Sequence, residues 1–400
     1  MNKRSYQKKK LFLHKFYSEK SYYSIILGGN KMTDRCRQET FLVQIGNNRD
    51  EHFRAVSTPI YFSTAFRHEE IGLQDGYDYI RTGNPTRTVL EEAVAELEKG
   101  DKAFATSSGM SAVQLVFSLF EKGDHIISSR DIYGGNFRLF EIFEKKYGFE
   151  FSYWDGKDYE ELETLKRENT KAIFIETPTN PLMQTVKLSK ISEFSHKNDL
   201  LHIVDNTLYT PYIQRPIEEG ADIVIHSATK YLAGHNDVLA GLVIAKGEEV
   251  CEELSFLHNS IGAVLAPYDC WSLIRGMKTL ALRMRQHERN AKHVIDFLQD
   301  HPLVTNVYYP GRGGMLSFEI INENLVEPFL KALQVFTFAE SLGGVESFLT
   351  YPVTQTHMDI PEEVRLSYGL SNRLLRASVG VEHEEDLVND LARAFEQIRT

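Results

Sequence analysis

The chain has 400 residues, of which 42% are hydrophobic and 25% are charged, a balance typical of a soluble globular enzyme with two or three domains. Its apolar runs are far shorter than the roughly 20 residues that a membrane-spanning helix needs, so the sequence argues against a transmembrane protein. The net charge of −11 argues against a nucleic-acid or anionic-membrane binder, whose binding surface would be basic. We therefore expect a small molecule or another protein as the partner.

The three cysteines, Cys36, Cys251 and Cys270, are far apart and odd in number, which argues against a disulfide framework. They show no CxxC spacing, so a structural zinc site is not expected either. The sequence thus predicts a protein of the reducing cytoplasm that holds no metal.

Residues 1–31 differ from the rest of the chain, because eight basic residues and one acidic residue give them a charge of +7 and leave −18 for the remainder. Three interpretations are open. A secretory signal needs an uninterrupted apolar core, which His14 and Lys15 break. A basic arm for nucleic acid has only its composition in its favour. We favour a start of translation at Met32, because the codons for residues 28–31 can resemble a ribosome-binding site; an intact-mass measurement would test this.

The middle of the chain repeats a pattern of strand, turn and helix. Asn84 can cap a helix that has Pro85 at its first position, and Gly100 is the expected end of that helix. A strand is predicted at residues 102–106 and a buried helix at 111–120.

Further β-branched runs, separated by helical stretches, predict a mainly parallel sheet with helices on both faces, which is an α/β domain. In such domains ligands collect at the carboxyl ends of the strands. After residue 288 the pattern shifts to helix with a few strands, among them 316–320 and 375–379, which predicts a smaller α+β domain. Arg283 belongs to a basic stretch that we interpret as a solvated face or an intersubunit contact. The runs of the α/β domain span residues 125–129, 171–176, 201–204, 222–226 and 241–245.

Lys230 follows the predicted strand 222–226 closely, with the hydroxyls of Ser227 and Thr229 beside it. A buried ammonium group is costly, so a lysine at this place suggests Schiff-base chemistry, with the hydroxyls placed for an anion such as phosphate. A surface lysine one turn beyond the strand is the more common situation when the pattern is taken alone.

Asp205 ends the predicted strand 201–204 and is open to two interpretations. It can cap the next helix, or it can hold the proton on a pyridinium nitrogen, which is what makes pyridoxal phosphate (PLP) an electron sink.

The turn around Ser108, Gly109 and Met110 lies between a strand and a helix, where free N–H groups attract phosphate, although any α/β protein has such turns. Tyr133 follows the next strand and can either stack on a flat cofactor or belong to the core.

Eight motifs occur together in the order found in one enzyme family, and through them the chain resembles the PLP-dependent enzymes of cysteine and methionine metabolism. Within that family the pattern is most similar to cystathionine γ-synthases that also act as O-acetylhomoserine thiolyases. The resemblance covers about residues 36–398. The motifs are Tyr79 to Thr86, Ser108-Gly109-Met110, Tyr133-Gly134-Gly135, Thr177 to Pro181, Val204 to Thr207, His226 to Tyr231, Ser341 to Ser347 and Leu375 to Gly380.

The resemblance implies an aminotransferase-like fold, fold type I, and assigns a role to each candidate residue. Lys230 would form the Schiff base, Asp205 would pair with the pyridine nitrogen, and Tyr133 would stack on the ring and assist proton transfer. Arg376 and Ser341 would bind the substrate carboxylate, and Glu346 would meet the distal ammonium of the cysteine portion. Asn180 would lie near the phenolic oxygen of the cofactor. The phosphate would be held by Ser108, Gly109, Met110, Ser227 and Thr229, with Tyr79 and Arg81 reaching in from a neighbouring subunit.

The activity that the resemblance implies is replacement of the acyl group of an O-acylhomoserine by cysteine, which gives cystathionine, or by sulfide, which gives homocysteine, in methionine biosynthesis. A homotetramer of dimers with shared sites is also implied. Two alternatives remain: a cystathionine β- or γ-lyase or methionine γ-lyase on the same scaffold, and a protein that keeps the fold as a binding or regulatory module.

The chain is accordingly divided into four parts: a basic extension (1–31), an arm toward the neighbouring subunit (32–83), the PLP-binding α/β domain (84–288) and the C-terminal α+β domain (289–400). One departure from the family pattern lies after Gly311, where many relatives carry an additional stretch of roughly fifteen to twenty residues before the segment that begins here at Gly313. This shortening resembles the bifunctional synthase and thiolyase subgroup.

Overall fold

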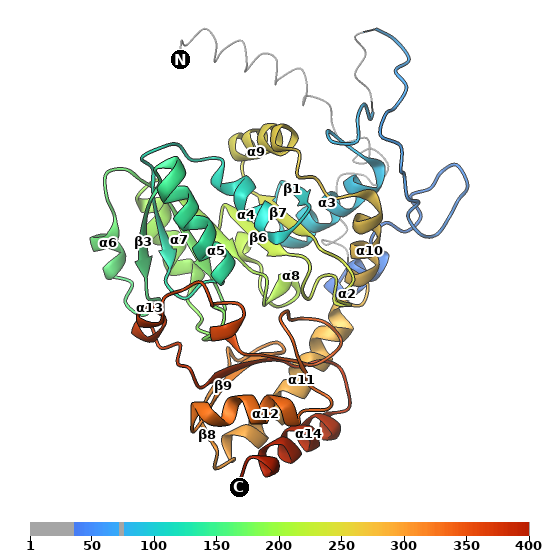
Figure 1. The fold of residues 1–400 in the computed structure, drawn as a ribbon. Helices are drawn as coiled ribbons and strands as arrows, with labels where there is room; N and C mark the ends of the chain where they lie inside the picture. Colours follow the sequence, from blue (N-terminus) through green and yellow to red (C-terminus); the bar gives the residue numbers. More distant parts are fainter. Residues whose placement is uncertain (1–35, 72–75, 400) are drawn as a thin grey trace.

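A computed structural model describes residues 36–71 and 76–399. The chain forms a larger α/β unit around a seven-stranded sheet and a smaller unit around a five-stranded sheet (Figure 1). The predicted basic extension 1–31 and the proposed start at Met32 lie outside the described residues. The division into an α/β and an α+β part agrees with the sequence, although the predicted limit after residue 288 falls within one continuous helix, α11 (Leu280–Gln299).

The larger sheet has the strand order β1-β7-β6-β5-β4-β2-β3 and is mostly parallel, as predicted. Strand β7 is the exception, because it pairs antiparallel with both β1 and β6. The connection between β6 and β7 contains no helix that could carry the chain back to the opposite end of the sheet, so β7 reverses direction. The strands are β1 (Lys102–Thr106), β2 (His125–Ser129), β3 (Glu150–Trp154), β4 (Thr170–Glu176), β5 (Leu201–Asp205), β6 (Ile223–Ser227) and β7 (Gly241–Ala245).

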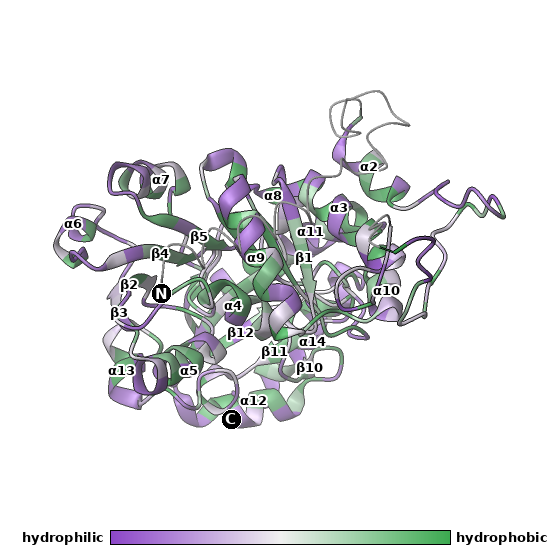
Figure 2. Ribbon diagram, turned by 90° about the horizontal axis from the view of Figure 1, so that it is seen from above, coloured by the Kyte–Doolittle hydropathy of each residue, from purple (hydrophilic) through white to green (hydrophobic). Residues whose placement is uncertain are grey.

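Helices cover both faces of this sheet, and each face has its own apolar core. The central strands consist mainly of hydrophobic residues, whereas outer helices such as α7 contain both hydrophilic and hydrophobic residues (Figure 2). One core lies under α3 (Pro85–Glu98), α7 (Leu188–Lys197), α10 (Pro267–Met277) and the first turns of α11, and the other lies under α4 (Gly109–Phe117), α5 (Gly134–Ile142) and α9 (Glu248–Ile261).

Helix α3 begins as the sequence predicts but ends differently. The Asn84 side chain accepts hydrogen bonds from the N–H groups of Thr86 (3.0 Å) and Arg87 (3.3 Å), which caps the helix. Lys99, not Gly100, takes the left-handed conformation that ends it, with φ 67°. Gly100 is required for another reason, because a Cβ atom there would lie 2.3 Å from Cγ2 of Ile244 on the sheet.

The smaller sheet has the order β10-β11-β12-β9-β8, and its core packs against the C-terminal half of α11 together with α12 and α14. Strands β9 and β12 match the two strands predicted here, whereas β8, β10 and β11 were not predicted. The elements of this unit are β8 (Val304–Tyr308), β9 (Met315–Ile320), α12 (Val326–Ala332), β10 (Thr337–Phe338), β11 (Phe348–Thr350), α13 (Glu362–Ser367), β12 (Leu374–Ser378) and α14 (Glu384–Gln397).

The segment before α3 begins with helix α2 (Gln38–Gln44), which packs on the larger unit through Phe41 and Leu42. The stretch after α2 has little regular structure and extends away from that unit (Figure 1). After α2, several large apolar side chains of this segment are exposed, among them Phe53 (82%) and Phe62 (66%). None of the helices in the described residues is long and apolar enough to cross a membrane. The remaining short elements are the π-helix Phe143–Tyr147, α6 (Glu161–Leu165), α8 (Thr210–Ile213) and the 3₁₀ turns Pro216–Glu219, Glu323–Leu325 and Pro352–Thr354.

Candidate active site

A cavity of about 170 Å³ lies at the carboxyl ends of the parallel strands of the larger sheet. This is the edge at which ligands of such sheets collect. Residues of the smaller, C-terminal unit also line the cavity. Most of the predicted site residues line it, and they come from positions up to 268 residues apart. They are Ser108, Gly109, Met110, Tyr133, Asn180, Asp205, Ser227, Thr229, Lys230, Ser341 and Arg376.

The Lys230 side chain lies in this cavity, and its Nζ atom donates a hydrogen bond to Oγ of Ser341 (3.1 Å). Burial, and then the positive charge of Arg376, lower the pKa of the Lys230 ammonium to about 8, against the opposing effect of the Glu340 carboxylate. A lysine of this kind is partly neutral at physiological pH, so its nitrogen can act as a nucleophile and as a base.

Arg283 corrects one prediction, because it is buried and does not lie on a solvated face. Its guanidinium donates to the carbonyl oxygens of Tyr231 (2.7 Å) and Gly276 (2.9 Å), and to the Thr279 hydroxyl (3.0 Å). Since Tyr231 follows Lys230 directly, this arginine holds the turn that carries the lysine.

The predicted phosphate cradle lies at the start of α4, beside the loop that carries Lys230. The Ser108 hydroxyl accepts a hydrogen bond from the N–H of Ser111 (3.0 Å), which leaves the first N–H groups of the helix for a ligand. A Cβ atom on Gly109 would lie 2.8 Å from Cβ of Ser227, so only glycine permits this close approach. The Thr229 hydroxyl already accepts a hydrogen bond from the N–H of Ala240 (3.0 Å), which holds the loop after Lys230.

Asp205 lies at the end of β5, with one carboxylate oxygen accepting the N–H of Thr207 (3.0 Å). Burial raises the pKa of the Asp205 carboxyl. Glu176, at the end of the neighbouring strand β4, also lines the cavity and accepts the N–H of Tyr133 (3.0 Å). Sequence reasoning missed Glu176, although the rule that found Asp205 applies equally to it.

The Arg376 guanidinium is almost fully buried and held by three acceptors. It donates to Oδ1 of Asn180 (2.9 Å), the carbonyl oxygen of Ser341 (2.9 Å) and the Thr350 hydroxyl (3.0 Å). Its Nε atom has no hydrogen-bond partner among the described residues. Burial lowers the pKa of Arg376 to about 10, which leaves it charged at neutral pH. A fixed guanidinium with a free donor suits a substrate carboxylate, and Asn180 orients it.

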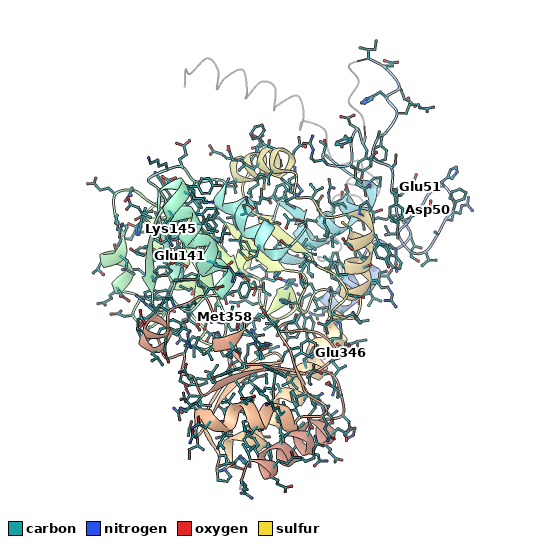
Figure 3. All side chains as sticks on the ribbon, viewed as in Figure 1. Asp50, Glu51, Glu141, Lys145, Glu346 and Met358 are labelled. Carbon is teal, nitrogen blue, oxygen red and sulfur yellow. The ribbon has the colours of Figure 1, made fainter. Side chains whose placement is uncertain are left out.

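Three predicted residues lie elsewhere in the single chain. Arg81 donates to the backbone and side-chain oxygens of Asn259 (2.5 and 2.7 Å), and its guanidinium lies over the ring of the exposed Tyr79. Glu346 is exposed and accepts a hydrogen bond from Asn236 (2.6 Å). It lies at the right-hand edge of the molecule in Figure 3, at the level where the larger and the smaller unit meet.

A further acid that lines the cavity and whose charge acts on Arg376 is Glu340, which the sequence analysis did not single out. Its place directly before Ser341 is the signal that could have found it. No group of three or more His, Cys, Asp or Glu side chains that could hold a metal occurs within residues 36–71 and 76–399.

The donor set fits PLP. A lysine with a lowered pKa can bond the aldehyde carbon, and a helix N-terminus with two serine hydroxyls suits the phosphate. The buried Asp205 carboxyl suits a protonated ring nitrogen, and Tyr133 offers a flat ring. Gly109, where a side chain would clash, leaves the room that a phosphate needs. Fold and site together define a PLP-dependent enzyme of fold type I.

The comparisons with known proteins agree with this class and narrow it. The family described as Cys/Met metabolism PLP-dependent enzyme matches residues 39–396, and the chain belongs to it.

Two curated relatives from Bacillus subtilis (strain 168) differ in their names. A cystathionine γ-synthase/O-acetylhomoserine (thiol)-lyase is 58% identical over 90% of this chain and 97% of its own length. A cystathionine γ-lyase is 46% identical over 90% of this chain and 100% of its own length. Among solved structures, cystathionine γ-synthase from Xanthomonas oryzae pv. oryzae in complex with cystathionine has a TM-score of 0.88 and 38% identity, covering 91% of this chain and 98% of that one.

Proposed function

We propose that this enzyme replaces the acyl group of an O-acylhomoserine by the thiol of cysteine to give cystathionine, and also accepts sulfide to give homocysteine. The observation that carries the proposal is the higher identity to a synthase and thiolyase (58%) than to a lyase (46%) over the same share of the chain. The reaction would serve methionine biosynthesis by transsulfuration in the cytoplasm.

The side chains of the cavity suit this chemistry. PLP, when bound, supplies an electron sink for the carbon that carries the substrate amino group. Arg376 would hold the substrate carboxylate and thereby set which bond at that carbon is broken. The Lys230 amine, with its pKa near 8, would take up the proton from that carbon and return one, while Tyr133 covers the ring.

The distal ammonium group of the cysteine portion needs an acid within reach. We assign this role to Glu340 in place of Glu346, because Glu340 lines the cavity beside Ser341 whereas Glu346 does not line it and is bound to Asn236. Replacing Glu340 by Gln should raise the KM for cysteine more than the KM for sulfide, because sulfide carries no ammonium group. An equal effect on both thiols would contradict this assignment.

A complete site would need a second copy of the chain. Tyr79 and Arg81 do not line the cavity of their own chain, and they follow an arm with exposed apolar side chains. These observations support delivery of Tyr79 and Arg81 to the phosphate of a neighbouring subunit, within the proposed tetramer of dimers.

A lyase on the same scaffold is the second candidate, since the 46% identical γ-lyase covers the same share of this chain. The two are separated by assaying purified holoenzyme with O-acetylhomoserine plus cysteine and, separately, with cystathionine alone. Faster formation of cystathionine in the first assay than its breakdown in the second supports the synthase. The reverse order would overturn it.

A further inference from the structure

Glu176 and Asp205 form a pair of carboxyls at one edge of the large sheet. They are the last residues of the adjacent parallel strands β4 and β5, and they are register partners. Partners in parallel strands point to the same face and lie about 4.8 Å apart along the hydrogen-bonding direction. Both side chains line the same cavity, so the two carboxyls lie side by side within it.

The close contacts of this pair are hydrogen bonds and not ion pairs. In the described part of the chain neither carboxyl forms an ion pair. The backbone N–H groups of Tyr133 and Asn180 favour the ionised form of Glu176, and the backbone N–H and side chain of Thr207 favour that of Asp205. A third buried acid, Asp131, follows β2 on the other side of Glu176. Two neighbouring carboxyls in a low-dielectric site cannot both be ionised at an ordinary pH, so the pair shares a proton.

The other charged and titratable groups around the pair come from elements on several sides. Arg376 on β12 and the Tyr133 phenol at the start of α5 interact with Glu176, and Lys230 lines the same cavity. His226 on β6 favours the ionised form of Asp205.

The surroundings place the shared proton on Glu176. Burial, then Asp205 and Asp131, raise the pKa of Glu176 well above its ordinary range, against the opposing effect of the Tyr133 and Asn180 backbone N–H groups. Burial also raises the pKa of Asp205, but the Thr207 side chain, the Thr207 backbone N–H and His226 oppose that effect. Donors oppose burial at both carboxyls, but Glu176 on β4 lies between two other acids, Asp131 after β2 and Asp205 on β5, so Asp205 is the better site for the negative charge.

We propose that Glu176 is a positioning residue that carries the proton of this pair at neutral pH and so leaves Asp205 as the single carboxylate for a cationic ring nitrogen. A protonated Glu176 still accepts the Tyr133 N–H, and it adds no second charge beside the ring. This role does not depend on which reaction the enzyme catalyses, so it stands or falls separately from the proposed synthase activity.

The first test compares PLP affinity in the full chain, using Glu176→Gln and Asp205→Asn. Glutamine matches a protonated glutamate in shape and charge, so we expect the dissociation constant of PLP in the E176Q variant to stay within about threefold of the wild-type value. The D205N variant should lose about a hundredfold or more, because it removes the only negative charge beside the ring nitrogen. A loss of about tenfold or more in E176Q would show that Glu176 is ionised, and it would overturn the proposal.

The second test needs no bound cofactor. The pKa of Glu176 is raised in the folded chain, so its protonated form stabilises the fold at low pH, and this stability is lost as pH rises from the ordinary glutamate value of about 4.3 through the raised value. The melting temperature of the wild-type chain should therefore fall relative to that of E176Q over this range. The proposal would be contradicted if the difference in melting temperature between the wild type and E176Q stayed constant over this pH range, or if the wild type became relatively more stable as pH rises. Glu193→Gln, which removes an exposed carboxyl on α7, is the matched control and should follow the wild type.

If E176Q does not fold, infrared spectroscopy of protein labelled with ¹³C in its glutamate carboxyls replaces it. Burial also raises the pKa of two other glutamates, Glu91 and Glu144, so the measurement is made on a variant in which both are replaced by Gln. A protonated carboxyl stretch at neutral pH supports the proposal, and its absence overturns it.

Discussion

The lowered pKa of Lys230 leads to a quantitative prediction. An exposed lysine has a pKa of about 10.4, whereas that of Lys230 is about 8 in the cofactor-free cavity. At neutral pH the fraction of neutral amine is then about 250 times larger than for an exposed lysine, which is the form that bonds an aldehyde. We therefore expect the rate at which Lys230 reacts with a neutral aldehyde to rise with pH to a midpoint of about 8.

The assay is reductive methylation of the cofactor-free full chain with formaldehyde and cyanoborohydride, followed by quantification of the peptide by mass spectrometry. Lys157, which is 72% exposed, is the internal control in the same digest. Charge variants test the cause: Arg376→Met should raise the midpoint of Lys230, and Glu340→Gln should lower it by roughly half a pH unit, because Glu340 is exposed and screened. A Lys230 midpoint above about 9.5, or no movement in either variant, would refute the electrostatic reasoning.

Three further predictions concern the cofactor. Lys230→Ala should abolish the covalent link to PLP and lower turnover by about a thousandfold or more, since it removes both nucleophile and base; borohydride reduction and peptide mapping would detect any remaining link. Arg81→Ala should weaken PLP retention although Arg81 does not line its own cavity, and normal retention during dialysis would rule out a shared site. Gly109→Ala should destabilise the protein by about 1–3 kcal/mol and weaken PLP binding, because its Cβ would lie 2.8 Å from Cβ of Ser227. Thermal melts with and without PLP would measure both effects.

The fold could be predicted from the sequence where strands are fully buried. β1, β2 and β7 have the predicted limits, because each is a short apolar or β-branched run between turn residues. β3 was missed, since it lies at the edge of the sheet and only two of its five residues are buried. β10 is only two residues long and exposed, which leaves no pattern to detect.

The site residues that could be predicted from the sequence are those that lie at strand ends or within the family motifs. Lys230 and Asp205 lie where a parallel sheet gathers its ligands, and the cavity contains both. Spacing along the chain could not decide between Glu340 and Glu346, because both belong to one irregular segment whose side-chain directions depend on contacts with distant residues. Glu346 accepts a hydrogen bond from Asn236 and does not line the cavity.

The direction of β7, which the sequence did not reveal, explains how the cradle is assembled. Because β7 runs antiparallel to β6, it starts at the end of the sheet where β6 finishes, so the loop with Lys230 stays above the cavity. Gly241, the first residue of β7, pairs with Ser227 on one side and Thr106 on the other, and a Cβ there would lie 2.1 Å from the carbonyl oxygen of Ser108. One antiparallel strand with glycine at its start thus brings the two serines of the cradle together. A parallel β7 would begin at the opposite end of the sheet and would require a crossover in place of the Lys230 loop.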